Sequence, residues 1–234
     1  DWEKNILTMQ RYRLPFFNYA GESLEIKFYM EDYIGEIETL TGAPSAFVVT
    51  GTDEEFVYEP VRTSTASVSI VTDSLLNDLF SVNSHHVAVK LYRGNKLLWT
   101  GYVEPEVFTQ AYVPIADKLS INCISAIGTL ENIQYEKQTE NGFITAINLL
   151  RYIIRSANGG YEKIYIPYVY GSSEVNYSTK KNIFDEITLA EENFTSEGMM
   201  LDEVLEYFCR FFNWTLYDYE GSLYFVDVDW KGEY

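Results

Sequence analysis

Apolar and polar residues alternate along much of the first half of the chain, with the period of two that is typical of strands buried on one face. The alternation is clearest at residues 24–30 and 66–70. Between these segments, residues 35–60 combine glycine, threonine, glutamate and proline with short apolar runs, which predicts short strands separated by turns. The first half is therefore expected to be mainly antiparallel β structure.

Residues 86–103 show the pattern of a β-hairpin, and a sharply bounded apolar strand follows it. Gly94 and Asn95 accept positive φ, so they predict a tight turn whose twist matches that of the flanking strands. Trp99 and Tyr102 can then supply large cross-strand contacts.

The period changes in the second half of the chain. Apolar residues at helical spacing predict one helix near 143–156 and another near 199–212. Gly159 and Gly160 are expected to end the first helix. The second helix leads into a hairpin at 214–229.

Together these patterns predict a β-rich α+β protein with two domains. Residues 1–138 are expected to form a mainly antiparallel β-barrel or sandwich, and residues 139–234 an α+β domain in which two helices pack on hairpins. The polar segment 136–142 marks the predicted boundary. A chain of 234 residues is long enough for two modest domains, each with its own core.

The composition indicates a folded, acidic protein. Hydrophobic residues make up 47% of the chain and charged residues 22%, which is ordinary for a globular protein. The formal charge of −18 would repel phosphate over a screening length of about 8 Å, and no basic stripe offsets it, so sequence-specific nucleic acid is excluded as a partner. The acidic surface suits solubility, or else basic partners or divalent cations. No apolar run approaches the roughly 20 residues of a membrane span, so membrane insertion is not expected.

The residues that could carry chemistry are few. His85 and His86 are neighbours at the start of a strand and should point to opposite faces, which suits metal chelation poorly. Glu104 and Glu106 are the most conspicuous carboxylate pair for glycoside hydrolysis, but 35 acidic residues produce such pairs by chance. No nucleophile elbow or phosphate-binding glycine loop is present. We therefore expect no catalytic residue, no cofactor and no metal site.

Cys123 and Cys209 lie far apart in apolar contexts, which favours buried free thiols over a disulfide, although the redox compartment stays open. Aromatic residues are abundant, with 20 Tyr and 14 Phe. Exposed tyrosines can anchor a protein interface or stack on sugars, whereas buried ones only pack a core. The candidates for an exposed aromatic surface crowd one part of the second domain: Tyr161, Tyr165, Tyr168, Tyr170 and Tyr177.

Two motifs carry a family resemblance: LYRGNKLLWTGYV at residues 91–103, with the strand at 119–126 behind it, and LDEVLEYFC at 201–209, followed by NWTL at 213–216. In their aromatic and glycine positions they resemble structural proteins of phage tails, especially tail-tip and baseplate hub proteins of phages and prophages of gut bacteria. The late motif looks like the helix-plus-hairpin unit of such hubs.

The resemblance implies a non-enzymatic virion protein that joins the tail tube to the tip complex as part of a ring-like homo-oligomer, commonly a trimer. Its partners would be other tail proteins and copies of itself, and it would be made in the bacterial host cytoplasm and reside in the virion tail. The chain is shorter than a complete hub, which suggests part of a longer protein. The alternative is a secreted or surface carbohydrate-binding module that uses exposed Tyr and Trp.

Overall fold

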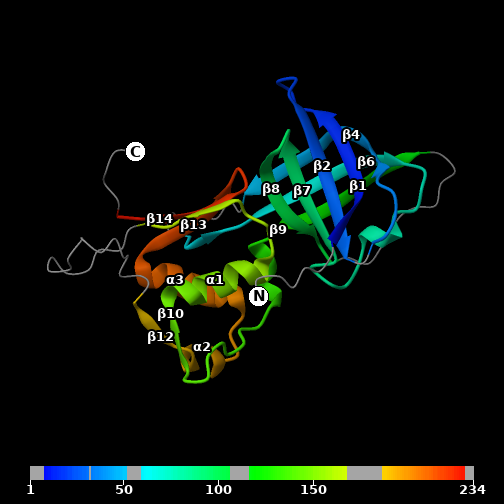
Figure 1. Cartoon of the computed structure of the whole chain (residues 1–234). Helices are drawn as coiled ribbons and strands as arrows, with labels where there is room; N and C mark the ends of the chain where they lie inside the picture. The colour runs from blue at the N-terminus through cyan, green and yellow to red at the C-terminus, as the bar shows by residue number, and fades with distance from the viewer. Residues whose placement is uncertain (1–7, 32, 52–58, 106–115, 168–185, 230–234) are drawn as a thin grey trace.

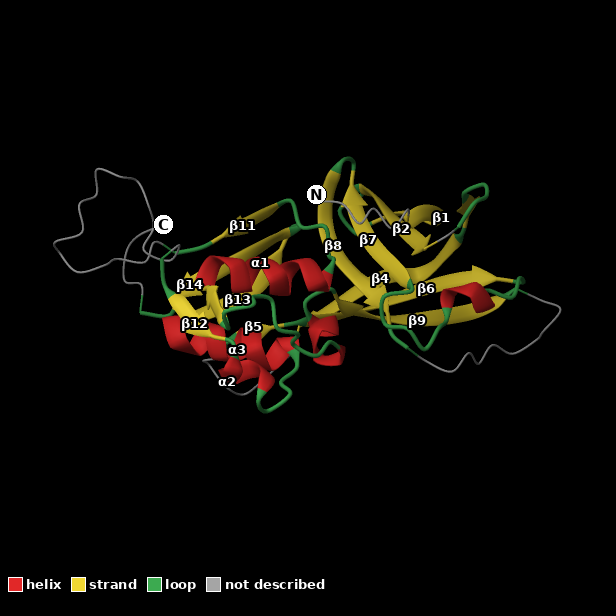
Figure 2. Ribbon diagram, turned by 60° about the horizontal axis from the view of Figure 1, so that its bottom comes forward, coloured by secondary structure: helices red, strands yellow, loops and turns green. Residues whose placement is uncertain are grey.

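The computed structural model describes residues 8–31, 33–51, 59–105, 116–167 and 186–229. Figure 1 shows a large curved sheet beside a smaller unit of helices and strands. Figure 2 shows the same two parts with the helices gathered almost entirely in the smaller unit. The predicted β-rich α+β fold class is confirmed.

The large sheet has eight strands in the order β3-β1-β2-β7-β8-β9-β6-β4. All its pairings are antiparallel except the short parallel pairing of β1 with β3. The strands are β1 (Thr8–Phe17), β2 (Ser23–Glu31), β3 (Glu38–Thr39), β4 (Thr41–Gly51), β6 (Ser64–Thr72), β7 (Val87–Arg93), β8 (Lys96–Val103) and β9 (Asp117–Ser125). A 3-10 helix, η1 (Asn77–Leu79), lies between β6 and β7. The predicted β7–β8 hairpin is confirmed, with Gly94 at φ 60° in its turn.

The two edge strands of the large sheet, β3 and β4, are consecutive in sequence and only Leu40 separates them. The sheet therefore curls so that its two edges come together at Leu40. The Leu40 amide donates to the Arg13 carbonyl oxygen at 2.8 Å, on the outer edge of β1. Pro15 directs its backbone to that same edge but has no N–H to donate. Within the described residues no ladder joins β4 to β1, so the sheet is not a closed barrel.

The smaller unit holds the helices and two smaller sheets. One sheet has the order β11-β14-β13-β5, and the other pairs β10 with β12. Its elements are η2 (Gly128–Asn132), β10 (Phe143–Thr145), α1 (Ala146–Ala157), β11 (Lys163–Tyr165), β12 (Thr188–Ala190), α2 (Glu192–Thr195), α3 (Leu201–Phe212), β13 (Trp214–Tyr219) and β14 (Ser222–Asp227). The two predicted helices and the C-terminal hairpin are confirmed. The first helix starts later than expected because the Thr145 side chain caps it, accepting from the Asn148 amide.

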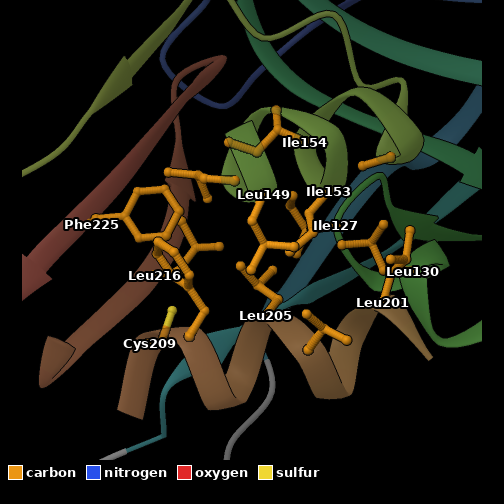
Figure 3. Packing of buried hydrophobic residues seen from close by; sticks show 14 of the residues in the cluster. Ile127, Leu130, Leu149, Ile153, Ile154, Leu201, Leu205, Cys209, Leu216 and Phe225 are labelled. Carbon is orange, nitrogen blue, oxygen red and sulfur yellow. The ribbon is translucent and has the colours of Figure 1, made fainter. Parts of the chain in front are cut away.

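Two separate clusters of buried side chains form the core. The first lies within the large sheet and includes Ile26, Phe28 and Val68, all fully buried. The second lies between α1, α3 and the four-stranded sheet, where Leu149 and Leu205 face the strands (Figure 3). Both cysteines are free and buried, as expected, and burial raises the pKa of Cys209 to about 12.

The chain passes from the first cluster to the second before the predicted boundary between residues 138 and 139. Ile127, Leu130 and Tyr135 already belong to the second cluster. Since η2 packs on α1 and α3, the chain joins the second core immediately after β9.

The polar segment that suggested the boundary is instead fixed to the second unit by one buried carboxylate. Glu191 is fully buried and accepts hydrogen bonds from the Tyr135 hydroxyl at 2.6 Å, the Gln138 amide at 2.6 Å and both the amide and the hydroxyl of Thr139. Burial by itself would raise the pKa of Glu191, but these hydrogen bonds outweigh it and hold the pKa below its usual range. The segment therefore belongs structurally to the smaller unit.

Strand β8 connects the two units through the face it turns away from the first core. The Thr100 hydroxyl donates to the Gly159 carbonyl oxygen at 2.7 Å, and the Tyr102 hydroxyl to the Asn158 carbonyl oxygen at 2.9 Å. Asn158 ends α1 in the left-handed conformation, with φ 49°. A Cβ atom on Gly159 would lie 2.8 Å from the Ala126 Cβ, so only glycine fits this close contact.

A second connection is made by β5 (Val61–Arg62), which comes from the chain of the large sheet but pairs in parallel with β13. The Leu216 amide donates to the Pro60 carbonyl oxygen at 2.8 Å, and the Thr215 hydroxyl to the Glu59 carbonyl oxygen at 2.6 Å. The smaller unit is therefore completed by a strand from the first half of the chain.

We predict that Tyr102→Phe lowers the free energy of unfolding by about 1 kcal/mol, because it removes a hydrogen bond between the units and leaves the Asn158 carbonyl oxygen without its donor. Urea unfolding followed by circular dichroism measures the change. Tyr19→Phe is the matched control, since that side chain is fully exposed. An equal effect in both variants would contradict the role of the Tyr102 hydroxyl.

Candidate functional site

The histidine that could have suggested chemistry holds the two units together. His85 stacks on Tyr102, with ring centroids 4.4 Å apart, and its Nε2 lies 2.8 Å from the Thr129 hydroxyl. Because that hydroxyl donates to the Ala126 carbonyl oxygen, it accepts from His85. Burial lowers the pKa of His85 and so favours the neutral ring, with its proton on Nε2.

Only one member of the candidate carboxylate pair lies within the described residues. Glu104 is half-buried, and Glu106 lies outside the described residues. In the described ranges no three His, Cys, Asp or Glu side chains are grouped so that they could hold a metal ion. Nor does any helix in those ranges have the length and apolar character to cross a membrane.

The feature that stands out is a row of tyrosines on the face of the four-stranded sheet that points away from α1 and α3. Tyr165 of β11 stacks on Tyr224 of β14, with centroids 4.7 Å apart and ring planes 11° from parallel. Tyr224 in turn stacks on Tyr217 of β13, at 5.5 Å and 11°. We call Tyr165, Tyr224 and Tyr217 the tyrosine ladder; Tyr219 meets its middle ring edge-on at 6.5 Å.

Strand register produces the tyrosine ladder. Tyr217 pairs with Tyr224 across the β13–β14 hairpin, and Tyr224 pairs with Tyr165 across the parallel β14–β11 ladder. On its other side Tyr217 pairs with Arg62 of β5. One row of side chains therefore crosses all four strands, with an arginine at one end and Tyr165 at the edge of the sheet.

The face around the tyrosine ladder carries little charge. Tyr165 is 44% exposed and Tyr217 36%. The outward positions of the hairpin are all uncharged: Thr215, Tyr217, Tyr219, Ser222, Tyr224 and Val226. The only acidic turn residue, Glu220, is held by Lys96 and Arg93. In a chain of charge −18, an aromatic face without acidic residues on its hairpin strands, flanked by the basic Arg62 and Lys163, is suited to contact with another macromolecule.

The rings overlap one another, which restricts what the face can bind. Nearly parallel rings at 4.7 Å and 5.5 Å are offset-stacked, so the middle ring, Tyr224, has a tyrosine ring on each side, and each end ring has one on a single side. A row of stacked rings suits a protein surface better than a sugar, which stacks on one open aromatic face.

The structure places the five tyrosines of the predicted exposed aromatic surface in three different environments. Tyr165 lies in the tyrosine ladder. Tyr161 packs against the second core as a half-buried side chain whose hydroxyl has no contact with solvent. Tyr168, Tyr170 and Tyr177 lie outside the described residues, and their role stays a prediction.

The position of the C-terminal hairpin turn in the sequence indicates that Tyr217 and Tyr224 pair across the two strands. A tight turn at Glu220 and Gly221 pairs residue 219 with 222, and therefore 217 with 224. Two tyrosines directly opposite each other on the outward face follow from the turn position. The partnership with Tyr165 has no such local signal, because β11 joins from a distant part of the chain.

The opposite face of β13 carries a half-buried carboxylate. Asp218 lies between the outward-pointing Tyr217 and Tyr219, so it points inward. Burial raises the pKa of Asp218 to about 6, and the negative charge acts in turn on Tyr161, whose pKa is raised mainly by burial. The strand that holds the exposed tyrosines thus contains a destabilising charge at neutral pH.

Comparison with known proteins gives little. No protein-family model matches the chain, and no curated protein matches it. Among solved structures, it is similar to the 43 kDa tail protein of prophage MuSo2 from Shewanella oneidensis, with 12% identity and a TM-score of 0.47 over 79% of this chain and 51% of that one. The chain therefore spans about half the length of that protein.

We predict that Asp218→Asn stabilises the protein at pH 7.5 by about 1 to 2 kcal/mol, because it removes a half-buried charge whose pKa is raised to about 6. A raised pKa in the folded state means that this carboxyl group favours folding at pH values below 4 and loses that contribution as the pH rises through about 6. The gain should therefore vanish near pH 4. Thermal unfolding across this pH range measures it, with the exposed Asp73→Asn as control. A gain independent of pH would contradict the assignment.

Proposed function

We propose that the chain is a non-enzymatic structural protein of a phage tail, of the hub or tail-tip class, joining tube and tip complex as part of a ring-like oligomer. The observation that carries the proposal is the tyrosine ladder, an exposed and uncharged aromatic row on a sheet whose other face is filled by α1 and α3. Tyrosines in such positions are frequent anchors of protein interfaces.

The two segments with a resemblance to tail proteins correspond to defined parts of the structure. Residues 91–103 form most of the β7–β8 hairpin, and residues 201–209 form most of α3, which leads into β13. The first of these elements connects the two units, and the second leads into the strand that contributes Tyr217 to the tyrosine ladder. The resemblance to tail proteins therefore lies in the β7–β8 hairpin and α3, on which a role in connecting other tail proteins would depend.

A connecting protein must transmit force without its parts separating. Here the two units share β5, and β8 contacts both. A ring further needs heterologous contacts, in which one surface of a subunit meets a different surface of the next. The tyrosine ladder supplies one such surface.

Carbohydrate binding is the second candidate, and one residue favours it. Tyr165 lies on β11 at the edge of the sheet and stacks on Tyr224 with one face, so its other face has no neighbour in the row. A single sugar could stack there. Glycan-array binding by the wild type that is lost in Tyr165→Ala would favour this candidate over the structural one.

We predict that the wild type forms a defined oligomer at micromolar concentration and that Tyr165→Ser with Tyr217→Ser weakens its assembly at least tenfold, because the two end rings of the tyrosine ladder are removed. Sedimentation velocity over a concentration series measures the assembly. The control is Tyr207→Ser, which changes a tyrosine on α3 that is 59% exposed. Circular dichroism verifies that each variant is folded. A wild type that stays monomeric throughout, or equal loss in the control, would contradict the proposal.

A further inference from the structure

The last residues of the edge strand β4 lack the features that usually prevent an edge from pairing. Natural edge strands carry charged residues, prolines or bulges. Residues 41–51 contain no charged residue at all, although 22% of the chain is charged. A bulge and Pro44 interrupt the pairing between Gly42 and Phe47. The four residues after Phe47 contain no bulge and no proline, so nothing in them blocks a further strand.

The outer edge of this strand is open, and apolar side chains are exposed along it. In the part of the chain that the structure describes, β4 pairs with β6 on one side and ends the sheet on the other. Val48 and Val49 are each 47% exposed. Two exposed β-branched residues in a row on an unprotected edge form a template for another strand.

A pocket of about 880 Å³ lies where β4 faces β1 across the gap in the large sheet. Its walls include Leu24, Ala46 and Phe47, and the exposed aromatic residues Phe17 and Tyr19 stand at the β1–β2 turn beside it. None of the residues that line the pocket is charged. The pocket therefore fits an uncharged occupant, since a charge placed there would lose its hydration without gaining a partner.

Two of the polar side chains on the pocket wall, those of Asn18 and Thr39, are engaged within the protein. The Asn18 carboxamide oxygen accepts from the amides of Ala20 and Glu22, and its nitrogen donates to the Glu22 carboxylate. The Thr39 hydroxyl accepts from Arg13 at 2.8 Å. The hydroxyl groups of Tyr19, Thr41 and Ser45 remain, and they are few against the apolar wall and the many hydroxyls of a sugar, so an apolar occupant is favoured over a glycan.

We propose that the outer edge of β4 from Phe47 to Gly51, together with this pocket, binds an extended, uncharged and apolar segment of a partner polypeptide. The segment adds to the large sheet as a further strand, and the β4 backbone supplies its hydrogen bonds. Alternate side chains of the segment point to the inner face, where Phe47 packs against Trp99 at 5.5 Å, and enter the pocket. Pro15 prevents β1 from taking this place itself, because it lacks the N–H that pairing across the gap would require.

The probe is a fluorescein-labelled peptide of about seven residues, alternating valine and threonine, which is a typical strand length. We expect saturable binding by fluorescence anisotropy, and at least tenfold weaker binding to Val49→Asp, which places a carboxylate at the pocket. Val82→Asp is the matched control, because that valine is 95% exposed and does not line the pocket. A peptide with aspartate in place of each valine should not bind.

Backbone pairing has its own test. Methylation of the peptide nitrogens on one edge should abolish binding, whereas methylation on the other edge should leave it unchanged, because only one edge of an added strand faces β4. Equal binding to Val49→Asp and Val82→Asp, insensitivity to both methylations, or no binding to the wild type would overturn the proposal. So would self-association of the wild type that Val49→Asp abolishes, since the edge would then belong to a second copy. None of these outcomes depends on the tyrosine ladder.

Discussion

Strand β8 is the element on which the rest of the structure depends, because both of its faces are buried. On one face Trp99 packs in the first core and donates to the Ser64 hydroxyl at 3.0 Å. On the other, Thr100 and Tyr102 bind the end of α1. Between them Gly101 lies so close to β9 that a Cβ atom would come within 2.1 Å of the Ile124 carbonyl oxygen. A strand filled on both sides cannot shift without separating the two units.

This arrangement has a consequence for how the protein could carry load. The β5 strand and the β8 face link the units at two places far apart in sequence, so a rotation about either link would break the other. The tyrosine ladder lies on the sheet that β5 completes, and Arg62 of β5 stands in the same row as Tyr217. Force applied at the tyrosine ladder would therefore pass directly into the chain of the large sheet.

Local patterns predicted the β7–β8 hairpin, α1, α3 and the C-terminal hairpin, because their periodicity, turns and caps lie within short stretches of sequence. Pairing between strands far apart in sequence could not be predicted from these local patterns. Nothing in Val61 and Arg62 indicates that they join β13, and nothing in Tyr165 indicates that it stacks on Tyr224. The polarity of the segment 136–142 predicts a boundary, but the amides of Gln138 and Thr139 and the Thr139 hydroxyl bind the buried Glu191, which lies more than 50 residues further along the chain.

The distribution of charge over the surface determines where the protein can make contact with a partner. With a formal charge of −18, two copies of the chain, or the chain and nucleic acid, repel each other over most of their surface. The outward hairpin positions around the tyrosine ladder and the β4 edge are uncharged, and they belong to different sheets. Repulsion elsewhere then suppresses random association, while contact at an uncharged surface costs little desolvation. A strongly acidic protein can thus keep exposed aromatic and apolar surfaces without aggregating, provided that each surface meets a partner of matching shape.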